Sequence, residues 1–226
     1  MSKNRKLVVW DWNGTLLDDT DLMLVCVNII LERMNRAPIT MERFRETQMK
    51  PLKNFYLAVG VDEKDIPHVL EQERTLFHDH YEPMAIGAPL RDGATDLLAA
   101  LNTHGTAGVI VSNHITGEII RLLKQHDIHH HFDEVIAYES RGVQFREPKG
   151  EKLHAYIAAN GLNDADGIII GDTVEEMEIA RALGMASVAI TGGIQSESRL
   201  RAAHPDHIVH SLHELKPVFQ ERGFAP

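Results

Sequence analysis

Short apolar runs alternate with amphipathic segments along most of this chain. Residues 7–10 (Leu-Val-Val-Trp) form an uninterrupted apolar run, which predicts a buried strand. From residue 92 onward, similar runs alternate with segments of helical periodicity. The predicted strands are 7–10, 107–111, 134–137, 167–170, 186–190 and 207–209, and the predicted helices between the later ones are 94–102, 117–126, 150–160 and 174–183. This alternation predicts a parallel sheet covered by helices on both faces.

Residues 18–85 follow a different pattern, because they show helical periodicity without a strand signal. The predicted helices are 21–36, a helix capped by Thr40, 52–59 and 62–81, followed by a loop that Pro83, Gly87 and Pro89 mark. This block interrupts the chain soon after the first strand. We therefore predict an α/β protein whose Rossmann-like, three-layer core of parallel strands comprises residues 1–17 and 86–226, with an inserted α-helical cap at residues 18–85.

The composition is that of a soluble globular protein. The chain has 226 residues, of which 43% are apolar and 25% charged, and it contains no stretch of about 18 apolar residues that would span a membrane. The start of the chain lacks the apolar segment of a signal peptide, and Cys26 is the single cysteine, so we expect a buried thiol and a cytoplasmic protein. The formal net charge of −10 argues against nucleic acid or an anionic membrane as a partner, but not against a small anionic substrate.

Polar residues follow several predicted strands at the point where each strand ends. Asp11 follows the first strand, Ser112 the second, and Asp172 the strand at 167–170. The carboxyl ends of parallel strands meet at one edge of the sheet, which is where open α/β sheets bind ligands. Asp11 and Asp172 offer oxygen ligands suited to Mg²⁺, and a carboxylate there is also a candidate nucleophile. Lys149, in a loop at the same edge, would hold a carboxylate and a phosphate dianion together.

These segments together resemble the haloacid dehalogenase superfamily, and its phosphatase branch in particular. The four family motifs correspond to Asp11–Thr15, Ser112, Lys149 and Asp172–Glu176. The resemblance extends over essentially the whole chain, including the helical cap after the first motif, as in phosphoglycolate-phosphatase-like members. It implies a hydrolase that acts on a small phosphorylated metabolite with the help of Mg²⁺.

The resemblance also implies a role for each motif residue. Asp11 would attack phosphorus and become an aspartyl phosphate. Mg²⁺ would be bound by Asp11, the backbone carbonyl of Asn13 and Asp172, with Glu176 acting through water. The remaining residues would bind the phosphoryl group or let it approach closely: Gly14, Thr15, Ser112, Asn113 and Lys149.

Asn13 departs from the phosphatase pattern, which places a second Asp at this position. That Asp protonates the leaving group and later activates the water that hydrolyses the aspartyl phosphate, and an amide can do neither. A general acid or base contributes about 10²–10⁴-fold to a rate. We therefore expect slow hydrolysis of alkyl phosphates. Two alternatives stay open: another enzyme of the superfamily, such as a dehalogenase or phosphonate hydrolase, or a phosphate-binding regulatory protein with little turnover.

Several basic residues keep two interpretations. The family's Lys-Pro order is reversed at Pro148-Lys149, so Arg146 and Lys152 are further candidates for the motif lysine. Lys50 and Lys53 in the cap are either surface lysines or contacts for an anionic substrate. The histidine-rich run 126–131 is either a solvated connection, which its position between a helix and a strand favours, or an adventitious site for Zn²⁺ or Ni²⁺.

Overall fold

The sheet of this protein has six strands, all parallel. The computed structural model describes residues 5–141, 148–162 and 167–224. The sheet order is β3-β2-β1-β4-β5-β6. The strands are β1 (Leu7–Trp10), β2 (Ala107–Ile115), β3 (Glu134–Tyr138), β4 (Ile168–Gly171), β5 (Ala186–Ile190) and β6 (His207–Val209). The predicted α/β fold with a parallel sheet is confirmed.

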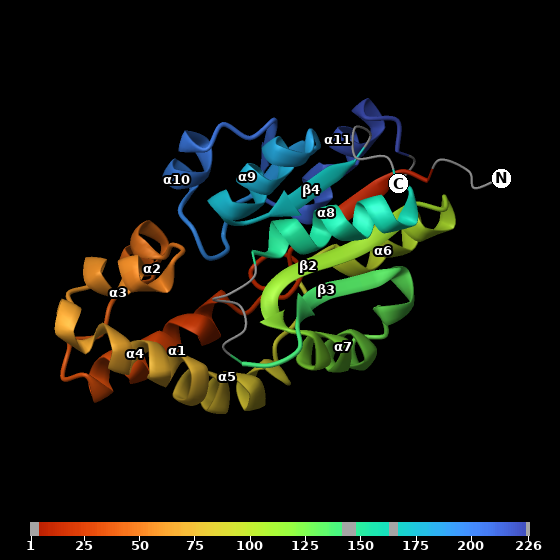
Figure 1. Cartoon of the computed structure of the whole chain (residues 1–226). Helices are drawn as coiled ribbons and strands as arrows, with labels where there is room; N and C mark the ends of the chain where they lie inside the picture. Colours follow the sequence, from red (N-terminus) through yellow and green to blue (C-terminus); the bar gives the residue numbers. More distant parts are fainter. Residues whose placement is uncertain (1–4, 142–147, 163–166, 225–226) are drawn as a thin grey trace.

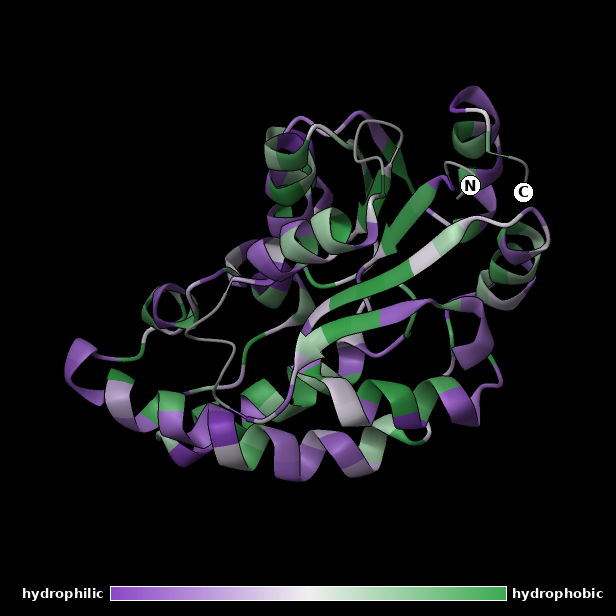
Figure 2. Cartoon of the chain, turned by 45° about the vertical axis from the view of Figure 1, so that its right-hand side comes forward, coloured by the Kyte–Doolittle hydropathy of each residue, from purple (hydrophilic) through white to green (hydrophobic). Residues whose placement is uncertain are grey.

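Helices cover both faces of the sheet and complete three layers (Figure 1). Val8 and Trp10 of β1 pack with α6, α7 and α11, whereas Leu7 and Val9 point to the opposite face, with α8 and α9. The helices are α6 (Ala94–Thr103), α7 (Thr116–Gln125), α8 (Lys149–Asn160), α9 (Val174–Leu183), α10 (Glu197–Ala202) and α11 (Leu215–Glu221). Figure 2 shows the result as apolar strands between helices that are polar outside. A fully apolar run such as β1 is therefore what a central strand requires.

The helices between β1 and α6 form a separate group beside the carboxyl ends of the strands (Figure 1). We call residues 18–85 the helical insertion. Its helices are α1 (Thr20–Arg33), α2 (Met41–Thr47), α3 (Leu52–Ala58), α4 (Ile66–Gln72) and α5 (His78–Ala85), and the π-helical segment Glu73–Phe77 joins the last two. Thr40 caps α2 as predicted, since its side chain accepts a hydrogen bond from the backbone of Arg43. None of the helices in the described residues has both the length and the apolar character that crossing a membrane requires.

Two details of the predicted elements are wrong. Pro83 does not mark a loop but lies inside α5, which continues to Ala85. Burial of Tyr81 and Ala85 on the core side of this helix outweighs the local cost of a proline. The strand predicted at 107–111 runs on to Ile115, with a register shift against β3 after Val111. The polar residues beyond position 111 thus continue the strand with an irregular pairing, which periodicity does not reveal.

Candidate active site

The predicted site residues converge where the chain changes direction across the sheet. The chain runs outward from β1 to β2 and β3, and then returns to place β4 on the other side of β1. Asp11 follows β1, and its backbone N–H donates to the carbonyl of Ile170 in β4 at 2.9 Å. Ser112 comes from β2 and Asp172 follows β4. Such a switch point opens a crevice between neighbouring strand ends.

A cavity of about 330 Å³ lies between this edge of the sheet and the helical insertion. The polar residues lining it from the core are Asp11, Asn13, Ser112, Asn113, His114, Lys149, Thr173, Glu175, Glu178, Gln195 and Arg199. The insertion contributes Gln48, Lys50, Glu73 and His78, together with apolar residues that include Phe44, Phe55 and Phe77. A cavity of this size fits a small metabolite.

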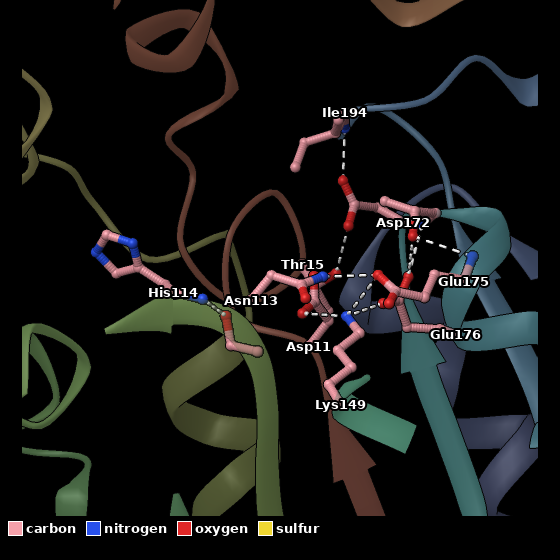
Figure 3. Close-up of polar contacts among 11 residues, drawn as sticks. Asp11, Thr15, Asn113, His114, Lys149, Asp172, Glu175, Glu176 and Ile194 are labelled. Atoms are coloured by element: carbon pink, nitrogen blue, oxygen red, sulfur yellow. Dashed lines mark hydrogen bonds and ion pairs between the residues drawn. The ribbon is translucent and has the colours of Figure 1, made fainter. Parts of the chain in front are cut away.

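Three buried carboxylates form the centre of the site. Oxygen atoms of Asp11, Asp172 and Glu176 all lie within 4.8 Å of one another. Asp172 is fixed from two sides, because one oxygen accepts from the Thr15 hydroxyl at 3.1 Å and the other from the Ile194 backbone N–H at 2.5 Å (Figure 3). The prediction that distant acids meet at one sheet edge thus agrees with the structure.

Lys149 is the cation that faces this cluster. It is the first residue of α8, and its Nζ lies 3.3 Å from Asp11 Oδ1 and forms an ion pair with Glu176 (Figure 3). Lys152 points elsewhere, since its Nζ donates to the carbonyl of Ala137 and lies 4.4 Å from the ring centre of Tyr138. Arg146 lies outside the described residues. Of the lysine candidates, Lys149 is the one that reaches the carboxylates.

The electrostatic balance of the site favours a further cation. Burial raises the pKa of Asp11 well above its usual range; Lys149 opposes this shift, and the neighbouring acids Glu176 and Asp172 add to it. Burial and Glu176 raise the pKa of Asp172 to about 7, against the hydrogen bonds from Ile194 and Thr15. Burial would lower the pKa of Lys149, but Asp11 and the two glutamates raise it well above its ordinary value. The ammonium of Lys149 alone cannot neutralise the carboxylates of Asp11, Asp172 and Glu176. Their oxygen atoms therefore fit a divalent cation such as Mg²⁺.

Ser112 and Asn113 occupy the end of β2 beside Asp11. Both line the cavity, and Ser112 Oγ accepts a hydrogen bond from the His114 backbone at 3.2 Å. The Asn113 side chain is engaged separately, because its Nδ2 donates to Glu175 at 2.6 Å. Ser112 does not cap α7, whose N-cap is Ile115. Among the described residues the Ser112 hydroxyl donates no hydrogen bond, so its hydrogen can bind a ligand in the cavity.

Gly14 and Thr15 serve the carboxylate cluster and do not line the cavity. Gly14 has φ +70°, and a Cβ there would come within 2.3 Å of Asp172 Oδ2. Thr15 orients the other oxygen of the same carboxylate. The carbonyl of Gly14 is held by Arg91, whose guanidinium donates to it at 2.9 Å and to the carbonyl of Thr191 at 2.8 Å. These contacts position the metal-type ligands; direct phosphate contact by the two residues stays a prediction.

Glu176 also stabilises the start of helix α9. Its Oε2 accepts from the backbone N–H and the hydroxyl of Thr173, while Oε1 faces Lys149. The pair forms a capping box at the start of α9. Both oxygens of Glu176 are thus engaged by neighbouring groups, and its role toward a metal stays a prediction.

Asn13 is bound to a buried acid that sequence reasoning did not single out. Its Nδ2 donates to Asp19 Oδ2 at 2.6 Å and to the Tyr81 hydroxyl at 2.7 Å, and Tyr81 also donates to Asp19. The other oxygen of Asp19 accepts from the Gly14 backbone at 2.8 Å. Burial raises the pKa of Asp19 against these hydrogen bonds. The amide hydrogens are thus committed, and a carboxyl group sits directly behind the position where the family pattern has one.

The structure also places the remaining residues that the sequence singled out: two lysines of the insertion, the histidine-rich run and the cysteine. Lys50 lines the cavity, whereas Lys53 forms an exposed ion pair with Glu63 at 3.0 Å. No group of converging metal ligands lies in the histidine-rich run 126–131, a statement that covers the described residues. Cys26 is buried, and burial, Glu73 and Glu82 raise the pKa of its thiol to about 12, so it is not a thiolate at neutral pH.

Comparison with known proteins agrees with this fold and site. The sequence profile of the haloacid dehalogenase-like hydrolase family matches residues 8–190. Among curated proteins, "Probable phosphatase IndB" of Dickeya dadantii is 26% identical, with 93% of this chain and 92% of that protein covered. A phosphoglycolate phosphatase of Salmonella choleraesuis is 28% identical, with 96% and 93% covered.

Solved structures show the same fold. A haloacid dehalogenase-like family protein from Streptococcus pneumoniae superposes with a TM-score of 0.78 at 23% identity, covering 96% of this chain and 99% of its own. A "predicted phosphatase" from Clostridium acetobutylicum gives 0.80 at 21% identity, covering 97% and 100%. The chain therefore belongs to the haloacid dehalogenase-like hydrolase family. Within it, the chain falls in the phosphoglycolate-phosphatase-like branch and is an enzyme of the phosphatase type.

Proposed function

We propose that this enzyme hydrolyses the phosphoryl group of a small metabolite through an aspartyl phosphate on Asp11. The observation that carries the proposal is the buried contact between Asp11 and Lys149 at the carboxyl end of β1, with Ser112 on the neighbouring strand β2. Asp11 attacks phosphorus, the bond to the leaving oxygen breaks, and Lys149 and Ser112 hold the phosphoryl oxygens. Water then displaces the aspartate and releases inorganic phosphate.

Magnesium is the proposed cofactor. Asp11, Asp172 and the backbone carbonyl of Asn13 would hold the ion, with Glu176 one water away. When bound, it neutralises the charge that repels a phosphate dianion from the carboxylates. We expect excess chelator to abolish phosphatase turnover and added Mg²⁺ to restore it, measured as phosphate release. Full activity in chelator, with release of halide from a haloacid, would instead support a dehalogenase.

Metal binding should depend on pH through Asp172. An unfolded Asp titrates near pH 3.9, and the folded group near 7, so between these values the folded metal-free protein holds a proton that the unfolded chain has lost. The free energy of unfolding from this group therefore falls as pH rises from about 4 to 7. Because Mg²⁺ displaces that proton, its effect on the melting temperature should be larger at about pH 8 than at about pH 5. Melts of the native protein and of Asp172→Asn test this, and an effect independent of pH would contradict it.

The helical insertion is proposed to act as a cap that closes the cavity and selects the leaving group. Lys50 is its cation at the cavity, so it is placed to bind an anionic part of the substrate beyond the phosphoryl group. We expect Lys50→Met to raise KM for an anionic phosphate ester at least about tenfold, and to change turnover of a neutral aryl phosphate little. Lys53→Met, which removes an exposed and already paired lysine, is the matched control. Equal effects of the two variants would contradict this role.

Turnover is proposed to be slow for leaving groups that need a proton. Asn13 cannot supply one, and Asp19 lies behind it without lining the cavity. Substrates with good leaving groups, such as acyl phosphates, should lose little in the first step.

A cytoplasmic location is proposed for the same protein, supported by its single, buried cysteine.

A further inference from the structure

A second group of metal-type ligands lies apart from the carboxylate cluster. His78 and Glu82 come from successive turns of α5 in the helical insertion, and His114 comes from the end of β2. Their ligand atoms all lie within 4.8 Å of one another. Figure 3 shows the His114 ring turned away from Asp11 and Lys149. These three side chains therefore form a separate site at the junction of the insertion and the sheet.

The distances within this group are close to those around a bound ion. Glu82 Oε1 lies 2.9 Å from His78 Nδ1 and 3.4 Å from His114 Nε2. A tetrahedral Zn²⁺ with bonds of about 2.0–2.1 Å separates its ligand atoms by about 3.3 Å. Small side-chain adjustments would thus place three ligands on one ion. The two imidazole rings are stacked with 5.6 Å between their centres, and one nitrogen of each ring lies near the same carboxylate oxygen, Glu82 Oε1.

Hydrogen bonds alone leave this group incomplete. His114 is 7% exposed, and its Nε2 lies 3.4 Å from Glu82 Oε1, but within the described part of the chain this nitrogen has no hydrogen-bond partner. Glu82 Oε2 is likewise buried and has no hydrogen-bond partner among the described residues. Buried polar atoms without partners are rare in native proteins. A cation between them would satisfy the imidazole nitrogens and the carboxylate together.

The local backbone supports a built site. The π-helical segment Glu73–Phe77 ends directly before His78, and such segments occur often at functional sites because they change the phase of the helix that follows. Tyr81, between the two ligands of α5, is fixed by its hydrogen bond to Asp19 and packs edge-on against His114 at 5.3 Å. The helix is thus held in the orientation that brings its ligands to β2.

We propose that His78, Glu82 and His114 bind one transition-metal ion of the Zn²⁺ class, which links helix α5 of the insertion to strand β2 of the core. Two imidazoles and one carboxylate favour Zn²⁺ or a neighbouring first-row ion over Mg²⁺, which prefers oxygen. Three protein ligands leave a fourth position, and His78 and His114 both line the cavity. The ion would brace the insertion in the position beside the cavity that the structure shows.

The test is metal binding to the full chain, not turnover. Protein stripped of metal is titrated with Zn²⁺ in excess Mg²⁺, which occupies the oxygen site, and the stoichiometry and Kd are measured by competition with a chromophoric chelator. We expect one tight equivalent of Zn²⁺ and a rise in melting temperature. With Co²⁺, the visible absorption spectrum should show coordination by nitrogen and oxygen at low symmetry. No tight equivalent would overturn the proposal.

Matched variants locate the site. We expect Glu82→Gln and His78→Asn each to weaken the tight equivalent at least about 10²-fold and to remove its effect on melting. His80→Asn, an exposed residue on the same helix, should leave both unchanged. Removing His129 and His130 tests adventitious binding by the histidine-rich run, and Asp172→Asn tests binding at the oxygen site. Loss of the tight equivalent in either of these last two variants, or its retention in Glu82→Gln and His78→Asn, would contradict the assignment whatever the outcome for phosphatase activity.

Discussion

Replacing Asp11 by Asn is expected to lower kcat/KM for aryl phosphates by at least about 10⁴-fold, in the range seen when an enzyme loses its covalent nucleophile. The substitution keeps the size of the side chain but removes the attacking oxygen's charge. It also removes the charge that faces Lys149 at 3.3 Å. Phosphate release with p-nitrophenyl phosphate and Mg²⁺ measures the loss.

The control for this variant lies on the same loop. Asp18 is an exposed acid a few residues on, so Asp18→Asn changes the net charge equally without touching the cavity. We expect it to retain native activity. Circular dichroism and melting curves establish that both variants fold. Retained activity in folded Asp11→Asn would contradict the proposed nucleophile.

Exchanging the amide and the acid between positions 13 and 19 is expected to raise turnover of an alkyl phosphate by about 10²–10⁴-fold, the usual contribution of a general acid. In the native chain Asn13 lines the cavity, and Asp19 lies behind it and accepts a hydrogen bond from Asn13 Nδ2 at 2.6 Å through its Oδ2. The double variant Asn13→Asp/Asp19→Asn keeps one amide and one carboxyl in hydrogen-bond contact and moves the carboxyl to the cavity. Steady-state rates with an alkyl and an acyl phosphate measure the effect, which should be larger for the alkyl ester.

The single variants show whether the pairing matters. Asn13→Asp alone places two carboxyls in contact in a buried site, where they share a proton and cannot both ionise. We therefore expect a smaller gain and a lower melting temperature than in the double variant. Asp19→Asn alone should give no gain. If Asn13→Asp alone equalled the double variant in both rate and stability, the contact between positions 13 and 19 would have no influence on turnover.

The convergence of Asp11, Ser112 and Asp172 could be predicted from the sequence, because each follows a buried apolar run that forms a strand, and the carboxyl ends of parallel strands lie at one edge of the sheet. The position of the Lys149 side chain is harder to predict from the sequence, because it depends on where α8 begins. That helix starts at Lys149 itself, which turns the ammonium into the cluster. The order of the motifs indicates a lysine in this region, but the sequence does not show which lysine side chain reaches the carboxylates.

The contacts made by the helical insertion could not be predicted. The phase of α5 depends on the π-helical segment before it, so neither the bond of Tyr81 to Asp19 nor the meeting of His78 with His114 follows from helical spacing. In the sequence, Asp19 is one of three acids, with Asp18 and Asp21, close to the start of a helix, and nothing in that pattern distinguishes it. The hydrogen bond that Asp19 accepts from Tyr81 forms only where α5 packs against the loop after β1. Such long-range packing leaves no periodic signal in the chain.

Trapping the phosphoryl enzyme tests whether Asp11 attacks phosphorus and whether the aspartyl phosphate is hydrolysed slowly because position 13 is Asn. The native protein is mixed with Mg²⁺ and acetyl phosphate, quenched in acid over a time course, and analysed by intact mass and peptide mapping. We expect one phosphoryl adduct per chain on Asp11 that forms faster than it decays, and that decays faster in Asn13→Asp/Asp19→Asn. Phosphate release without any adduct on Asp11, or an adduct on another residue, would contradict it.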